Sequence, residues 1–204
     1  MKWSVFLLLA GACLAGDGAR LVYTKSFPNS VPAYMQVTLD KAGHAEYKEA
    51  EDDPLPLKFQ LTPADTETMF ELAAKLDYFK HPLESPLKVA FMGMKTFHYE
   101  NGDQKSETKF NFSEDLVARD LQDWFEKMAE SAAHRIDLER AAKYDRLGVV
   151  KALTLLESAM ERKRLVGLEQ YLPTLDRIAN NESYMHTARA RAAEIAEAIR
   201  NPKP

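Results

Sequence analysis

Apolar residues recur at every second position through much of the chain from residue 21 to residue 112. Residues 34–39 alternate between apolar and polar, a turn-forming Asp-Lys-Ala-Gly follows, and the alternation resumes over residues 44–50. Such a period is typical of strands that bury one face. The two runs therefore predict a β-hairpin. A third alternating run covers residues 55–61, and because Pro54 and Pro56 cannot donate ladder hydrogen bonds, we expect this strand to begin at a sheet edge.

The period changes after Leu61 and predicts a helix over residues 63–79. Thr62 suits an N-cap, Pro63 is tolerated in the first turn, and Asp65 lies near the positive end of the helix dipole. The apolar side chains that follow share one helical stripe: Met69, Leu72, Ala73, Leu76 and Phe79. We expect this stripe to pack on the sheet.

Strand patterns return at residues 87–91, 97–99 and 110–112. Asn101-Gly102 is a strong hairpin signal, because both residues tolerate a positive φ. With these two residues as the loop, counting outward pairs Gly93 with Phe110 and Phe91 with Phe112. A phenylalanine would then lie across the glycine.

Residues from 113 onward show only helical periods. Ser113 suits the N-cap of a helix, and another helical piece is expected over residues 132–144. The buried face of the first helix comprises Val117, Leu121, Trp124, Phe125 and Met128. A third stripe starts after Arg146. Proline is disfavoured inside a helix, so a break is expected near residues 171–173. Ser183 suits the cap of a last helix.

These elements predict an α+β fold, in which an antiparallel β-sheet with one packed helix is followed by a C-terminal bundle of four or five helices. We expect residues 1–19 to be a cleaved signal peptide, residues 20–112 a β-rich domain, and residues 113–204 a helical region docked on it. A similar Gly-Leu-Leu spacing at residues 148–156 and 167–175 would fit either two HEAT-like units or two ordinary antiparallel helices, and we favour the latter.

The N-terminus has the pattern of a secretory signal. One positive charge at Lys2 precedes an apolar run that ends in small residues, and Asp17 follows. The run is too short for a transmembrane helix, and none is expected after cleavage. Cys13, the only cysteine, leaves two alternatives: lipidation as the first mature residue, or removal with a signal that is cut after Ala15 or slightly later. The expected location is periplasmic or extracellular, through bacterial export.

Composition excludes several classes of function. The 204 residues carry 27 Lys and Arg against 31 Asp and Glu, with a net charge of -4, so no nucleic acid is expected as a partner. The 46% of hydrophobic residues suffices for a core. The chain lacks a dinucleotide fingerprint, a P-loop and a Gly-x-Ser-x-Gly elbow, and we expect no cofactor.

The sharpest chemical candidate is Glu130, His134 and Asp137, whose i, i+4, i+7 spacing places them on one helical face. A carboxylate next to an imidazole could serve acid–base chemistry or share a metal ion. The alternative is a solvated charged face, which we favour. We likewise interpret the acidic stretch at residues 46–53 as a solvated loop rather than a calcium site, and the basic run 162–164 as a helix end rather than a contact for anionic lipid.

The sequence therefore favours an exported, non-catalytic protein that binds another protein or an envelope component through a sheet edge, a sheet face or the helical surface. The alternative is a small metal-dependent or hydrolytic enzyme that uses Glu130, His134 and Asp137.

Overall fold

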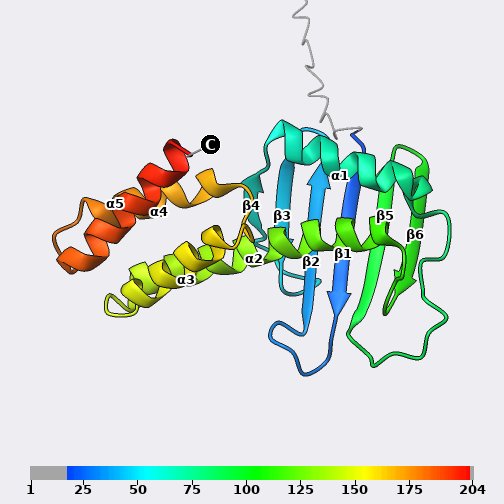
Figure 1. Ribbon diagram of the computed structural model, residues 1–204, viewed down its shortest axis with the longest axis horizontal. Coiled ribbons are helices and arrows are strands. Elements are labelled where there is room, and N and C mark those ends of the chain that lie inside the picture. Colours follow the sequence, from blue (N-terminus) through cyan, green and yellow to red (C-terminus); the bar gives the residue numbers. More distant parts are fainter. Residues whose placement is uncertain (1–17, 203–204) are drawn as a thin grey trace, which may run out of the picture.

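The computed structural model describes residues 18–202 and contains one six-stranded sheet and a set of helices (Figure 1). The elements along the chain are β1 (Arg20–Ser26), β2 (Tyr34–Asp40), β3 (His44–Lys48), β4 (Leu57–Gln60), α1 (Pro63–Lys75), η1 (Asp77–Phe79), β5 (Met94–Asn101), β6 (Gln104–Phe110), α2 (Leu116–Tyr144), α3 (Val149–Glu161), η2 (Leu168–Tyr171), α4 (Leu172–Ala179) and α5 (His186–Arg200). The expected α+β fold is confirmed.

The sheet has the strand order β4-β3-β2-β1-β5-β6, and all neighbouring strands are antiparallel. β1 lies inside the sheet, where it pairs with β2 through Leu21 and Leu39 and with β5 through Leu21 and Tyr99. The sequence pattern assigned no bounds to this strand, although it supplies two of the five strand pairings.

The alternation along the strands separates a buried face from an open one. On β1, β2, β3 and β5 the odd-numbered residues face inward, and Leu21, Val37 and Phe97 have no exposed surface. The even-numbered residues are mostly polar, as expected for an antiparallel sheet with one solvated face. Two helices, α1 and α2, lie across the buried face (Figure 1).

Helix α2 links two hydrophobic cores. Its first half packs with α1 and the sheet through residues such as Leu121 and Phe125, and its second half belongs to a core that it shares with α3, α4 and α5, beginning at Leu138. Figure 1 shows α2 continuing past the β4 edge into the helical bundle. One helix therefore holds the sheet and the bundle in place, and it covers the sheet in addition to the expected α1.

Several helix bounds differ from the sequence prediction. The two pieces expected before and after residue 130 form the single helix α2, because no glycine or proline interrupts residues 116–144. Its N-cap is Asp115 rather than Ser113, and the Asp115 carboxylate accepts from the backbone N–H groups of Val117 and Ala118. α1 ends at Lys75, and a short 3₁₀ turn follows.

The C-terminal helices show one confirmed prediction and one error. The expected break occurs near Pro173, where η2 ends and α4 places the proline in its first turn. The last helix has Met185 at its N-cap position, with no side-chain cap, so the prediction for Ser183 was wrong. Among residues 18–202, no helix is both long and apolar enough to cross a membrane.

Two strand predictions are also corrected. Residues 87–91 form a loop, consistent with Pro82 and Pro86 nearby, which cannot donate to a sheet. The β5–β6 hairpin turns at Gly102 and Asp103, so that Lys95 pairs with Phe110 and β6 ends before Phe112. The register thus differs by two residues from the prediction. Because side chains alternate with a period of two, this shift does not change which of them face inward.

Candidate functional site

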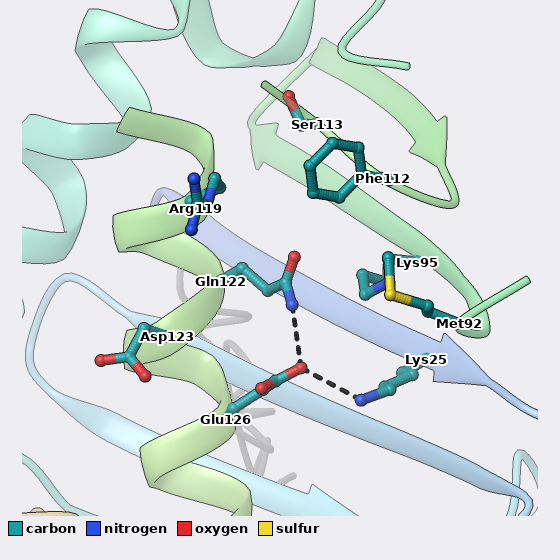
Figure 2. Close-up of a pocket in the computed structure, with 9 residues that line it drawn as sticks. All are labelled: Lys25, Met92, Lys95, Phe112, Ser113, Arg119, Gln122, Asp123 and Glu126. Carbon is teal, nitrogen blue, oxygen red and sulfur yellow. Dashed lines mark hydrogen bonds and ion pairs between the residues drawn. The ribbon is translucent and has the colours of Figure 1, made fainter. Parts of the chain in front are cut away.

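A cavity of about 400 Å³ lies beneath the first turns of α2, where β1 and β5 approach the end of the sheet (Figure 2). Most of the residues that line it are polar or charged, and Met92 and Phe112 are the two apolar ones. Its lining residues are Lys25, Met92, Lys95, Phe112, Ser113, Arg119, Gln122, Asp123 and Glu126.

Glu126 joins the sheet to α2 across this cavity. Its Oε1 accepts from Lys25 Nζ at 3.1 Å, from Gln122 Nε2 at 3.0 Å and, more weakly, from the Tyr23 hydroxyl at 3.4 Å. Figure 2 shows the first two contacts converging on this carboxylate. Glu126 therefore compensates one lysine of the cavity.

Lys95 is a second and far more buried lysine, with 3% of its surface exposed. Its Nζ donates to the backbone carbonyls of Asn111, at 2.6 Å, and Gly93, at 3.2 Å. Burial lowers the pKa of Lys95, and the neighbouring Lys25 lowers it further. The two carbonyls accept hydrogen bonds from the ammonium, and the Glu126 and Glu84 carboxylates, which are not in direct contact with it, partly offset the lowering of its pKa.

The remaining charges leave an excess of cations. Within residues 18–202, no ion pair within 4.0 Å involves Arg119. Asp123 pairs with Lys127 at 2.9 Å and with Arg164 at 2.6 Å, and in Figure 2 its carboxylate points away from Lys95. These two cations hold the pKa of Asp123 below its usual range despite partial burial. The cavity can therefore receive an anionic group.

Exposed apolar side chains border the cavity on the loop side. They lie on the β1–β2 connection, on the segment before β5 and at the first residue of β5, all at the same end of the sheet (Figure 1). Phe27 and Phe91 join the two loops, with ring centroids 5.8 Å apart. We call the exposed side chains the apolar rim: Val31, Leu87, Val89, Phe91, Met92 and Met94.

The rim differs from its surroundings in charge. Residues 27–35 and 86–94 contain no aspartate or glutamate and only one charged residue, Lys88, whereas the chain carries 31 acidic residues. The acidic loop 49–53 approaches the same end of the sheet, but the pairing of β1 with β2 continues to Ser26 and Tyr34, beyond the last β2–β3 pair. Glu51 of this loop lines the same hollow of the open face as Tyr34, so the acidic loop reaches the level of the last β1–β2 pair and lies beside the rim.

The open face of the sheet is a weaker candidate, because its charges satisfy one another. Glu100 contacts His98 Nε2 at 2.9 Å and Arg20 Nη2 at 2.7 Å. Hydrogen bonds from His98 and Arg20 lower the pKa of Glu100. This arrangement is typical of a solvated face.

The structure brings Glu130, His134 and Asp137 onto α2 but engages both carboxylates elsewhere. Glu130 accepts from Arg164 Nε at 2.9 Å, and Asp137 pairs with Arg140 at 3.3 Å. Burial lowers the pKa of His134, partly offset by the two carboxylates. No group of three or more His, Cys, Asp or Glu side chains within residues 18–202 could hold a metal ion.

Cys13 and the expected signal segment up to residue 17 lie outside the described residues. The first side chain of the core is Ala19, which is 4% exposed. In the basic run, Arg164 lies in the segment after α3, and its ion pairs with Asp123 and Glu130 hold that segment against α2.

Sequence reasoning missed both the cavity and the rim. The available signal for the cavity was Lys95, a charged residue at the inward phase of the run that continues through Phe97 and Tyr99. For the rim it was the combination of apolar residues with Pro82 and Pro86, which argues against a strand. No protein-family model matches this chain, and no curated protein is similar to it at the significance required.

Proposed function

We propose that this is an exported, non-catalytic protein that binds another protein or an envelope component through the apolar rim. The observation that carries the proposal is the exposure of Phe91, at 53%, together with other exposed apolar side chains on the two loops that Phe27 and Phe91 join. Contiguous exposed apolar surface commonly marks an interaction site. Export rests on the pattern of residues 1–16, with Cys13 either lipidated or removed.

The enzymatic alternative receives less support from the contacts on α2. Glu130 and Asp137 each pair with an arginine, which lowers their capacity to act as a base or a ligand beside His134. The cavity near Lys95 offers charged groups that could bind a ligand. Its lining residues include a serine and an aspartate but no histidine, so they do not form a Ser-His-Asp triad.

Site-specific cross-linking in native cells tests the proposal. A photo-reactive residue replaces Phe91 in one variant and Leu155 in a control variant, because Leu155 is also exposed but lies on α3 in the bundle. We expect adducts with an envelope component from position 91 and few from position 155. Mass spectrometry of the recovered protein should show a lipidated Cys13 or a new N-terminus before Ala19.

Equal adduct yields from the two positions would contradict binding through the rim. A protein that retained Met1 and remained inside the cell would contradict export.

A further inference from the structure

We propose that the rim binds a lipid bilayer surface that contains anionic headgroups, with its apolar side chains entering the bilayer and Lys88, Lys95 and Arg119 attracting the phosphates. This inference rests on the proposed function, because it names the component that the rim contacts. Three features of the described residues support it: the shape of the rim, its charges, and the cavity next to it.

The shape of the rim suits a bilayer. Val31 lies in the β1–β2 connection and is fully exposed, at 101%, and Phe91 and Met92 in the neighbouring loop are partly exposed. A specific protein interface buries about 800 Å² on each partner and needs a broad surface that matches the partner in shape. The interfacial region of a bilayer adapts its shape to the protein, so it can bury single side chains on loops without such a match.

The charges of the rim suit anionic lipid. Lys88 is exposed, and within residues 18–202 no ion pair within 4.0 Å involves it. Its neighbours from residue 86 to residue 94 are all uncharged. A lysine so placed can extend its ammonium to the headgroups while its methylenes lie along apolar surface. Carboxylates in this segment would repel the lipid phosphates, and residues 86–94 contain none.

The cavity continues this charge pattern inward. Met92 belongs to the rim and also lines the cavity, so the two features are continuous. Behind it lie Lys95, held by two carbonyls, and Arg119, which pairs with no carboxylate of the described chain. A headgroup phosphate above Met92 would therefore meet Lys95 and Arg119, because Glu126 is engaged by Lys25 and Glu84 accepts from the Asn111 N–H.

The acidic loop 49–53 determines how the molecule must approach the bilayer. It connects β3 and β4 at one edge of the sheet, whereas Asn111, which follows β6 at the other edge, holds the segment that contains Lys88. An anionic surface repels the acidic loop and attracts Lys88. The protein should therefore tilt so that the 86–94 segment enters first and residues 49–53 stay in water.

Vesicle co-sedimentation of the purified protein, in the processed form that cells hold, tests the inference. The probes are vesicles of phosphatidylcholine alone and of phosphatidylcholine mixed with phosphatidylglycerol. We expect binding to the mixed vesicles that weakens as salt is added. Val31→Ser and the double variant Phe91→Ser, Met92→Ser should each weaken it by roughly tenfold or more, because each removes a large apolar side chain from the bilayer.

Lys88→Gln separates the electrostatic part. It should weaken binding to the mixed vesicles by about fivefold and leave binding to phosphatidylcholine unchanged. Matched controls on α3 are Leu155→Ser and Lys151→Gln, an exposed apolar residue and an exposed lysine that face the solvent far from the rim. Both should bind as the unaltered protein does. Val31 makes no packing contact that its replacement would lose, so Val31→Ser remains informative if the double variant misfolds.

The outcomes are distinct. Failure of the unaltered protein to bind mixed vesicles, or binding that survives Val31→Ser and the double variant, would overturn the inference. If vesicles are not bound but position 91 still forms cross-links to a protein in cells, the lipid inference is wrong and the proposed function stands. If position 91 also forms no cross-links, both are wrong.

Discussion

Lys25 and Lys95 lie directly opposite each other on β1 and β5, with both side chains on the face of the sheet that α2 covers. Like charges at facing positions destabilise a strand pair. The structure offsets this with the Glu126 carboxylate, 3.1 Å from Lys25, and with two carbonyls at Lys95. The sheet thus keeps two cations at the edge of its core, beside the cavity.

Glu126→Gln should therefore destabilise the protein. The change removes the countercharge from Lys25 and leaves two lysines in mutual repulsion, for an expected loss of about 1–2 kcal/mol in the free energy of unfolding. Urea unfolding measures it. Adding Lys25→Gln should recover part of the loss. Glu139→Gln, which breaks a more exposed pair with Arg135 on the same helix, should cost less than about 0.5 kcal/mol. Equal losses from the two variants would show that the Lys25–Lys95 pair needs no carboxylate.

Gly93 permits the two rim loops to meet. Its φ is +92°, and an added Cβ would lie 3.0 Å from Phe27 Cβ. Gly93→Ala should lower the free energy of unfolding by about 2 kcal/mol, since it combines an unfavourable φ with a steric clash. Gly102→Ala is the control, because Gly102 also has a positive φ but no atom within 4 Å. The difference between the two urea midpoints measures the contact with Phe27, and its absence would refute the tight packing of these loops.

His134 predicts a loss of stability in mild acid. Burial lowers its pKa in the folded protein, against the opposing effect of Glu130 and Asp137, with Arg162 lowering it further. As the pH falls below about 6.5, the unfolded state takes up the proton first, so the folded state loses stability. Between neutral and mildly acidic pH, the melting temperature of His134→Gln should depend less steeply on pH than that of the unaltered protein.

His134→Ala also separates the two classes of function. A binding protein should retain its vesicle or partner binding within error, whereas an enzyme that uses His134 should lose turnover or metal uptake. Loss of an activity in a variant of unchanged thermal stability would favour the enzymatic alternative.

Buried tyrosines predict a second limit at alkaline pH. Burial raises the pKa of Tyr23, which also faces Glu126, and that of Tyr171, whose hydroxyl donates to the Ser131 carbonyl at 2.7 Å. Above pH about 10 the unfolded chain releases these protons while the folded protein keeps them, so stability falls as the pH rises. Tyr23→Phe should reduce this slope in urea unfolding at alkaline pH. Lys95 has the opposite effect on the pH dependence of stability, because its own pKa is lowered. The comparison of Tyr23 with Phe is therefore repeated in a protein that also carries Lys95→Met.

Helix starts were predicted correctly where a single capping signal preceded a clear helical period of apolar residues. The helix after Thr62 begins as expected, because the Thr62 hydroxyl accepts from the Asp65 N–H and Pro63 needs no partner. The prediction failed where two local signals were equivalent. Ser113 and Asp115 both precede α2, and in the folded chain the Ser113 hydroxyl accepts from the Asp115 N–H while the Asp115 carboxylate caps the helix.

The candidate site was harder to predict from the sequence than the fold. Alternation at Leu87, Val89 and Phe91 is the pattern of a strand, yet this segment is held by the Asn111 side chain, which accepts from Met92 N at 2.7 Å, and no strand pairs with it. The residues thus remain exposed. Nothing in a local window reveals that a neighbouring strand is missing.

The sequence by itself determined the α+β class, the inward phase of the strands that it located correctly and the position of most helices, because these follow from side-chain periodicity over a few residues. Tertiary structure alone decided that β1 lies between β2 and β5, that Lys25 meets Lys95 beneath Glu126, and that the rim gathers two loops at one end of the sheet. Those relationships join segments far apart in the chain, and they depend on which long-range pairings bury the most apolar surface for the conformational entropy that is lost.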